Sequence, residues 1–191
     1  PLVYALGTPA VDATDEDPLA HFLSAGRPAG PWLHPVLRPA SGKAAPVKAR
    51  VAIHGHFYYP ELVPDFLEHL SANATTADLY ITTAGSAEVQ EIRQTLAAAG
   101  IGKAEIWSVP NRGRDIGPFL VDLQSRLDGK YDIVGHVHGK RSGHANPQVG
   151  DRWREFAWQH VIGGLYPTMD RVAQAFVSDP GLGLVFPEDP H

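Results

Sequence analysis

Two segments of the sequence concentrate side chains that bind anions and exchange protons. The first is residues 111–115, with the sequence NRGRD, and the second is residues 136–141, with the sequence HVHGKR. Arginine presents fork-shaped donors that match phosphate and carboxylate, and a glycine between two arginines lets the backbone approach a ligand. The two segments predict a single polar, anion-binding site, formed where the fold brings them together.

The basic and imidazole side chains of the second segment have competing interpretations. His136 and His138 alternate along a predicted strand, so both imidazoles point to the same face. Such a pair binds a metal or a sugar hydroxyl, although two histidines do not complete a metal site, and a hydrogen-bonded place in the core suits each equally well. Lys140 and Arg141 follow these histidines in the sequence. They either neutralise a diphosphate or form a solvated basic loop.

Asp115 also has two competing roles. An aspartate before a helix can cap the helix and pair with a nearby arginine, and for an isolated RGRD sequence this is as good an interpretation as ligand binding. Polar side chains also end neighbouring strands, among them Thr82 and Thr83. Since such a gathering serves packing poorly, we favour ligand binding.

A third polar segment has the sequence HGHFYYP, beginning at His54, and we predict a tight turn between a strand and a helix. His54, His56 and Tyr58 are candidates for contact with a ligand there. Phe57 and Tyr59 are assigned to packing.

Residues farther along the chain extend the prediction. Trp153 is expected in the core, and Arg154 is a candidate for a buried charge partner. Residues 142–150 hold glycine, histidine and asparagine without apolar anchors. They suit either a lid over the site or a disordered loop.

The elements that must position these residues follow an alternating pattern from Ala49 onward. Strand-like apolar runs alternate with amphipathic stretches of helical length, which predicts an α/β fold: a mostly parallel, Rossmann-like sheet with flanking helices. The predicted strands are residues 50–54, 78–83, 104–109, 131–137 and 183–186, and the predicted helices are residues 60–71, 86–99, 116–127, 150–162 and 168–178. Ligands bind beyond the carboxyl ends of parallel strands, where the polar segments fall.

The first part of the chain differs from the rest. We expect residues 1–48 to form a helical element and a Pro/Gly-rich linker, and residues 49–191 to form the α/β domain. A helix beginning after Asp17 and ending at Gly26 has a suitable cap at each end. The chain starts without methionine and stops after a strand-like run, so we expect a fragment that is truncated at its C-terminus.

Composition excludes several classes of protein. A net charge of -5 argues against a general nucleic-acid-binding surface, and the absence of cysteine excludes disulfides, thiolate metal sites and a cysteine nucleophile. No apolar run approaches the roughly 20 residues of a transmembrane helix, and no secretory signal is present, so the default location is cytoplasmic. The sequence also lacks the GxSxG, Walker A, HExxH and GxGxxG motifs of common enzyme classes.

The order and spacing of several segments resemble the rhamnan synthesis protein F family. The segments are residues 53–60, 78–83, 111–119, 131–140, 153–154 and 183–188. The resemblance covers residues 50–191, and residues 17–27 are similar to a short segment that commonly precedes such domains.

The resemblance implies a bacterial glycosyltransferase-like protein that makes rhamnose-containing cell-wall polysaccharide or lipopolysaccharide O-antigen. It implies a nucleotide-sugar donor, a polysaccharide or lipid-linked acceptor, and other glycosyltransferase modules in the same longer chain. The implied location is cytoplasmic, peripheral at the inner face of the membrane. The fold implied is a glycosyltransferase A-type nucleotide-sugar domain.

One departure from that fold affects the expected cofactor. The position of its metal-binding Asp-x-Asp motif holds His136-Val137-His138 here. Either no ion binds there and Lys140, Arg141 and Arg114 supply the charge, or the histidines hold a softer metal. We favour the first alternative, so we expect no cofactor and do not favour a divalent metal.

The predicted site residues fall into a catalytic group and a substrate-binding group. Asp115, as general base on the acceptor hydroxyl, and His138 are the predicted catalytic residues. The predicted substrate-binding residues are His54, His56, Tyr58, Asn111, Arg112, Gly113, Arg114, His136, Lys140, Arg141 and Arg154. Two alternatives stay open: a non-catalytic glycan- or partner-binding module of a larger enzyme, and a metal-dependent hydrolase that uses His54, His56, His136 and His138.

Overall fold

The computed structural model describes residues 4, 7–8, 11, 17–28, 30, 36–38, 40, 42, 45–139 and 147–187. The chain divides into two compact units, Pro1–Arg38 and Pro39–His191, which are described separately. The predicted boundary after residue 48 stays a prediction.

The first unit contains the predicted short helix. Helix α3 covers Pro18–Ser24, and the Asp17 carboxylate accepts hydrogen bonds from the amides of Leu19 and Ala20. Gly26 has a φ of 77°, and its N–H donates to the carbonyl of Leu23 at the helix end. Both predicted caps are confirmed.

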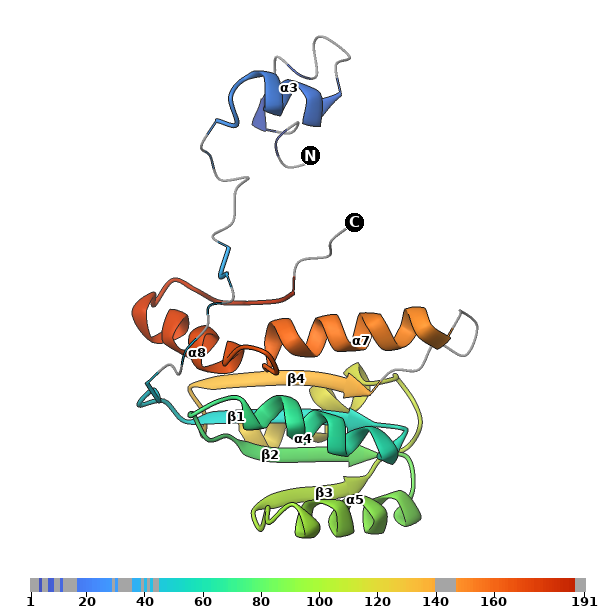
Figure 1. Ribbon diagram of the computed structural model, residues 1–191. Helices are drawn as coiled ribbons and strands as arrows, with labels where there is room; N and C mark the ends of the chain where they lie inside the picture. The colour runs from blue at the N-terminus through green and yellow to red at the C-terminus, as the bar shows by residue number, and fades with distance from the viewer. Residues whose placement is uncertain are drawn as a thin grey trace. The chain divides into compact units, whose positions relative to one another are not determined.

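The second unit is built on a four-stranded sheet. Its strands are β1 (Val51–Phe57), β2 (Asp78–Thr83), β3 (Ala104–Ser108) and β4 (Ile133–Gly139). All pairings are parallel and the order is β3-β2-β1-β4, as the arrows of Figure 1 show. The prediction of an α/β, Rossmann-like fold is confirmed.

One face of the sheet is covered by regular helices. They are α4 (Val63–Ser71), which follows the 3₁₀ turn η1 (Pro60–Leu62), α5 (Ser86–Ala98), α7 (Pro147–Val161) and α8 (Thr168–Ser178). Figure 1 shows α4 lying across β1 and β2, with α5 beside β3. Phe66, Ile92 and Trp158 pack against the strand residues of this face and are almost fully buried. Burial of each such side chain stabilises the fold by roughly 1.5–3 kcal/mol.

The opposite face is covered by the connection from β3 to β4. This connection holds a π-helical turn, η2 (Pro118–Asp122), and a single α-helical turn, α6 (Gln124–Leu127). The predicted helix over residues 116–127 is therefore interrupted. Pro118 has no N–H to donate, and the amide of Leu123 reaches back five residues to the Pro118 carbonyl.

Two strand predictions are corrected by the structure. Strand β1 continues to Phe57, so the residues from His54 onward are extended and do not form the predicted turn. A Cβ at Gly55 would collide with the Phe57 ring, which explains the glycine inside the strand. Residues 183–186 form no strand: Leu184 and Phe186 are exposed, and the segment pairs with no strand in the described part of the chain.

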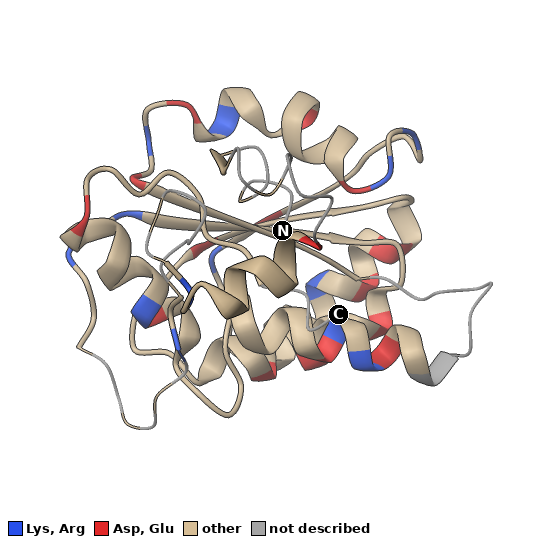
Figure 2. Ribbon diagram, turned by 90° about the horizontal axis from the view of Figure 1, so that it is seen from above, with Lys and Arg blue, Asp and Glu red and all other residues tan. Residues whose placement is uncertain are grey.

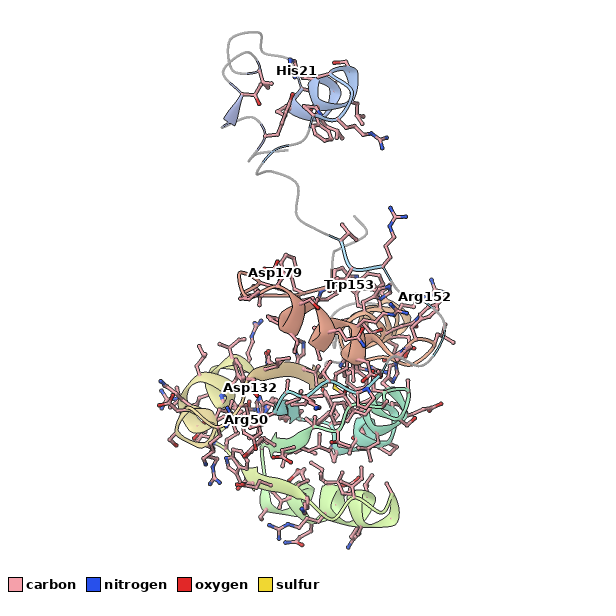
Figure 3. All side chains as sticks on the ribbon, turned by 90° about the vertical axis from the view of Figure 1, so that its left-hand side faces the viewer. His21, Arg50, Asp132, Arg152, Trp153 and Asp179 are labelled. Carbon is pink, nitrogen blue, oxygen red and sulfur yellow. The ribbon has the colours of Figure 1, made fainter. Side chains whose placement is uncertain are left out.

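An ion pair joins the beginnings of the two strands that carry the histidines. The Arg50 guanidinium donates to both carboxylate oxygens of Asp132, at 2.7 and 3.2 Å, and the Arg50 amide donates to the same carboxylate at 2.8 Å. The Asp132 amide in turn donates to the Arg50 carbonyl. Figure 3 labels both residues, which lie side by side.

Acidic and basic residues are interspersed along the helices (Figure 2), in keeping with a small net charge. Every helix among the described residues is too short or too polar to cross a membrane.

Candidate functional site

Four histidines gather on one face of the sheet. Strands β1 and β4 are neighbours, and their register pairs His54 with His136 and His56 with His138. Alternate residues of a strand share a face, so the four imidazoles form a two-by-two array that runs toward the carboxyl ends of the strands. The chain reverses its order of strand addition between β1 and β4, and such a switch point is the usual ligand site of an open parallel sheet.

A continuous chain of hydrogen bonds links three of these histidines with a threonine and an aspartate. Thr82 Oγ1 lies 2.9 Å from His56 Nδ1 and 2.9 Å from His54 Nε2. His54 Nδ1 lies 2.9 Å from His136 Nδ1, and His136 Nε2 lies 3.2 Å from the Asp115 carboxylate. We call this chain, His56-Thr82-His54-His136-Asp115, the histidine relay.

The charge of Asp115 sets the direction of the relay. An ionised carboxylate can only accept, so the N–H of His136 must be on Nε2, and Nδ1 of that ring carries a lone pair. Nδ1 of His54 then donates to His136, the Thr82 hydroxyl donates to Nε2 of His54, and Nδ1 of His56 donates to Thr82. Each imidazole is neutral, and each hydrogen bond has one donor and one acceptor.

The environment of the relay favours neutral histidines and an ionised aspartate. Burial lowers the pKa of His54 to about 3, and the charges of His136 and His56 add to this effect against that of Asp115. Burial also lowers the pKa of His56 and of His136, in both cases against the raising effect of Asp115. Burial raises the pKa of Asp115, but the His136 hydrogen bond and the His138 charge outweigh burial and hold this pKa below its ordinary value.

The Asp115 end of the relay is its most exposed end. His54 is fully buried and His56 nearly so, whereas the side chains of His136 and Asp115 are 17% and 21% exposed. His138 lies beyond the relay, with its Nδ1 3.3 Å from the Asp115 carboxylate and its side chain 44% exposed. Solvent therefore reaches Asp115 and His138 first.

An aromatic ring covers the buried part of the relay. Phe119, from η2, stacks on His136 with ring centroids 4.5 Å apart and on His54 with centroids 5.7 Å apart. Its ring shields the hydrogen bond between the two imidazoles from water, which strengthens that bond.

The backbone before η2 turns sharply and carries Asp115 to the histidines. Gly113 has a φ of 75° and Arg114 a φ of 53°, two consecutive residues in the left-handed region. A Cβ on Gly117 would lie 2.6 Å from the Arg112 carbonyl oxygen, so a side chain has no room at this position. The Asn111, Arg112 and Arg114 side chains are exposed at this turn.

The structure brings together five of the predicted site residues: His54, His56, Asp115, His136 and His138. The exposed residues 111–114 precede Asp115 directly. Tyr58 is 48% exposed and packs edge-on against Tyr59, while Phe57 is fully buried, and the packing roles of Phe57 and Tyr59 are confirmed. Lys140, Arg141 and most of the predicted lid, residues 142–146, lie outside the described residues.

Arg154 lies in helix α7, which covers the opposite face of the sheet. Its guanidinium pairs with Asp151 at 2.7 Å and lies over the Trp158 ring, with only 11% of the side chain exposed. The predicted buried charge partner is confirmed. The predicted core position of Trp153 is wrong, because this residue is 45% exposed.

Two members of the site were not predicted as site residues. Thr82 was noted only as the polar end of a strand, and its role as the bridge between two histidines depends on the pairing of β1 with β2. Phe119 carries no sequence signal of its own, since an apolar residue in a predicted helix is normally assigned to the core.

The fold and the site define a Rossmann-like α/β domain with a polar site at the switch point of a parallel sheet. The chain belongs to the rhamnan synthesis protein F family, whose model matches residues 19–191. This family suggests involvement in rhamnan and polysaccharide synthesis and sugar-related partners.

Two curated relatives are uncharacterized proteins named WxcX, from two strains of Xanthomonas campestris pv. campestris. Each is 32% identical to the chain over 134 residues, which is 70% of this chain and 18% of the relative. The chain thus spans about a fifth of the length of these relatives. No solved structure matches the chain significantly.

Proposed function

We propose that this domain binds a nucleotide-sugar at the carboxyl edge of its sheet and takes part in glycosyl transfer during the synthesis of rhamnan-type polysaccharide. The observation that carries the proposal is the position of Asp115 and His138. They form the exposed end of a polar array at the switch point, and Asp115 follows the exposed arginines of residues 111–114 directly. Family membership supports the same role.

The cationic residues near this edge suit the diphosphate of a sugar nucleotide. Arg112 and Arg114 are exposed, and guanidinium forks bind phosphate oxygens in pairs. Lys140 and Arg141 follow β4 directly in the sequence, and β4 is the strand next to β1. Positive charge here stabilises the diphosphate leaving group in the transfer step.

The remaining parts of the reaction belong to the longer protein in this proposal. The acceptor is a cell-wall polysaccharide or a lipid-linked O-antigen, other glycosyltransferase modules stand in the same chain, and the reaction takes place at the cytoplasmic face of the membrane. The relatives support a longer chain, since the match covers only 18% of their length.

Calorimetric titration with dTDP and UDP tests the proposal. We expect one of the two to bind, and we expect the double variant Arg112→Ala/Arg114→Ala to bind at least about 10-fold more weakly, because each charge-assisted hydrogen bond contributes about 1.5–3 kcal/mol. Arg93→Ala, an exposed arginine on α5, is the matched control and keeps full affinity.

Absence of binding to either nucleotide, by the folded chain and by the full-length protein, contradicts the proposal. Nucleotide binding with transfer activity that is unchanged by Asp115→Ala and His138→Ala in the full-length protein also contradicts it. That second result favours the non-catalytic binding module.

A further inference from the structure

The histidine and aspartate side chains at the open end of the relay have the geometry of a metal site. Each of Asp115, His136 and His138 offers one ligand atom, and these atoms all lie within 4.8 Å of one another. Among the residues that the structure describes, this is the one group of three or more such side chains with this geometry. We infer that Asp115, His136 and His138 bind a divalent transition-metal ion through two imidazole nitrogens and one carboxylate oxygen.

The separations from the Asp115 oxygen to the two imidazole nitrogens fit ligation of a single ion. The Asp115 oxygen lies 3.2 Å from His136 Nε2 and 3.3 Å from His138 Nδ1. Metal–ligand bonds of about 2.1 Å place neighbouring ligand atoms about 3.0 Å apart in an octahedral site and about 3.4 Å apart in a tetrahedral site. Both observed separations lie between these values.

The relay provides the outer support that a metal-binding histidine needs. A ligating imidazole normally donates its second N–H to a fixed acceptor, which sets the tautomer and orientation of the ring. His136 meets this requirement, since its Nδ1 lies 2.9 Å from His54 Nδ1, and His54 is held by Thr82. His69, which lies outside the relay, is arranged differently: it contacts the Asp65 carbonyl and a single carboxylate, that of Glu155.

The ligand set selects the class of ion and leaves room for a further ligand. Two imidazoles with one carboxylate suit zinc, iron, cobalt or manganese, whereas magnesium and calcium prefer sites made of oxygens alone. Three protein ligands leave coordination positions open, which is the arrangement of a catalytic ion. His138 is 44% exposed, so these open positions are accessible to water or to substrate oxygens.

Ion binding changes the expected role of Asp115. The resemblance led us to expect an Asp-x-Asp motif where His136-Val137-His138 stands, and the fold supplies a carboxylate there from the turn that ends at Asp115. A carboxylate that binds an ion is not free to accept a proton, so Asp115 acts as a ligand in place of a general base. The inference goes beyond the proposed function and stands without it, since the site can bind an ion whatever the substrate.

Ion binding has a consequence for the hydrogen bonds of the relay. In the free site the His136 N–H is on Nε2 and donates to Asp115. In the bound site Nε2 contacts the ion, the proton is on Nδ1, and His136 donates to His54. The hydrogen bonds through Thr82 to His56 then reverse as well. The proton that leaves Nε2 of His136 is matched by one taken up at Nε2 of His56, so every imidazole stays neutral and the number of protons on the relay is unchanged.

Titration of the tag-free chain with ZnCl₂, CoCl₂ and MgCl₂ tests the inference. We expect one Zn²⁺ or Co²⁺ per chain by calorimetry, Co²⁺ absorption bands typical of nitrogen and oxygen ligands, and no Mg²⁺ binding at the same concentration. We also expect long-range ¹H–¹⁵N spectra to show the His136 proton moving from Nε2 to Nδ1 when Zn²⁺ is added. Failure to observe stoichiometric Zn²⁺ or Co²⁺ binding by the folded chain overturns the inference.

Matched variants locate the bound ion. Asp115→Asn and His138→Ala weaken Zn²⁺ binding by at least about 100-fold, while Thr82→Val, in the outer support, weakens it by about 10-fold with one ion per chain retained. His160→Ala, in α7, is the control and leaves the affinity unchanged. Circular dichroism of the ion-free variants verifies that each one folds.

The outcomes separate this inference from the proposed function. Zn²⁺ affinity that is the same in Asp115→Asn as in the parent chain overturns the metal site, even if nucleotides bind. Zn²⁺ binding that depends on Asp115, in a chain that binds no nucleotide, supports the metal site and contradicts only the proposed function.

Discussion

The two faces of the sheet are built from the same strands but from opposite kinds of side chain. On one face, β1 and β2 place Phe57 and Ile81 against Phe66 and Trp158, and these side chains are almost completely buried. On the other face the same strands place histidines and Thr82 in a chain of hydrogen bonds. Because side chains alternate along a strand, neighbouring residues of the same strand contribute to the stabilising core on one face and to the polar site on the other.

Two adjacent threonines show this difference most directly. Thr82 and Thr83 are both fully buried and both belong to β2. Thr82 Oγ1 contacts two histidines, whereas Thr83 Oγ1, on the apolar face, finds no hydrogen-bond partner among the described residues. A buried threonine hydroxyl therefore bridges two histidines on the polar face, whereas on the apolar face it lowers the stability of the fold.

The largest expected effect comes from the apolar face. Phe66→Ala removes a fully buried ring and leaves a cavity, so we expect a loss of about 3–5 kcal/mol in the free energy of unfolding. Urea denaturation measures this loss. Leu165→Ala, at an exposed position, is the control, and a loss below about 1 kcal/mol in Phe66→Ala argues against a tightly packed face.

The next effect is the acid sensitivity of the polar face. The pKa of His54 is lowered to about 3, so below pH 6.5 the unfolded chain binds a proton that the folded chain does not. Stability is therefore greatest above pH 6.5 and falls as the pH drops, by at most about 1.4 kcal/mol per pH unit for one histidine. Urea midpoints between pH 7 and pH 4 measure the slope, and a slope as steep in His54→Leu as in the parent chain contradicts the assignment to His54.

Substituting the two threonines by valine changes the free energy of unfolding by a smaller amount, and we expect the change to have opposite signs at the two positions. Thr82→Val leaves nitrogens of His54 and His56 without a partner, so we expect a loss of about 1–3 kcal/mol. Thr83→Val removes an unpaired buried hydroxyl, so we expect no loss or a gain of up to about 1 kcal/mol. Thermal and urea unfolding of both variants test the comparison, and equal losses in the two refute it.

The smallest effect concerns the segment that covers the polar face. Val121 lies in η2 and is 77% exposed, so Val121→Ser changes the free energy of unfolding by less than about 0.5 kcal/mol. Leu123→Ala, at a fully buried position of the same segment, is the comparison and costs about 2–5 kcal/mol. A large loss in Val121→Ser points to a contact of this side chain with another part of the protein.

The sequence predicted the elements of the sheet better than it predicted the contacts of the site. The strand at Asp78–Thr83 and the helix at Thr168–Ser178 have the bounds that their apolar periodicity indicates. Hydrophobic patterns of this kind are local, and so they can be read from a single segment.

The arrangement of the site depends on pairings that no local pattern contains. The polar edge was predicted, but the pairing of His54 with His136 requires knowledge that β1 and β4 are neighbours. Gly55 was misread as part of a turn, because a glycine that makes room for an aromatic ring and a glycine in a turn look alike in sequence. The contact of Asp115 with two imidazoles likewise depends on a backbone turn at Gly113 and Arg114.

The ion pair at the strand beginnings has a consequence for alignment. Exposed ion pairs contribute little to stability, and Arg50 and Asp132 are both well exposed. Their hydrogen bonds nevertheless join β1 and β4 at one fixed offset, four residues before His54 and His136. A slip of one residue would turn one row of imidazoles away from the other. The pair therefore sets the register of β1 against β4, and so determines which histidines face each other, although it lies outside the site.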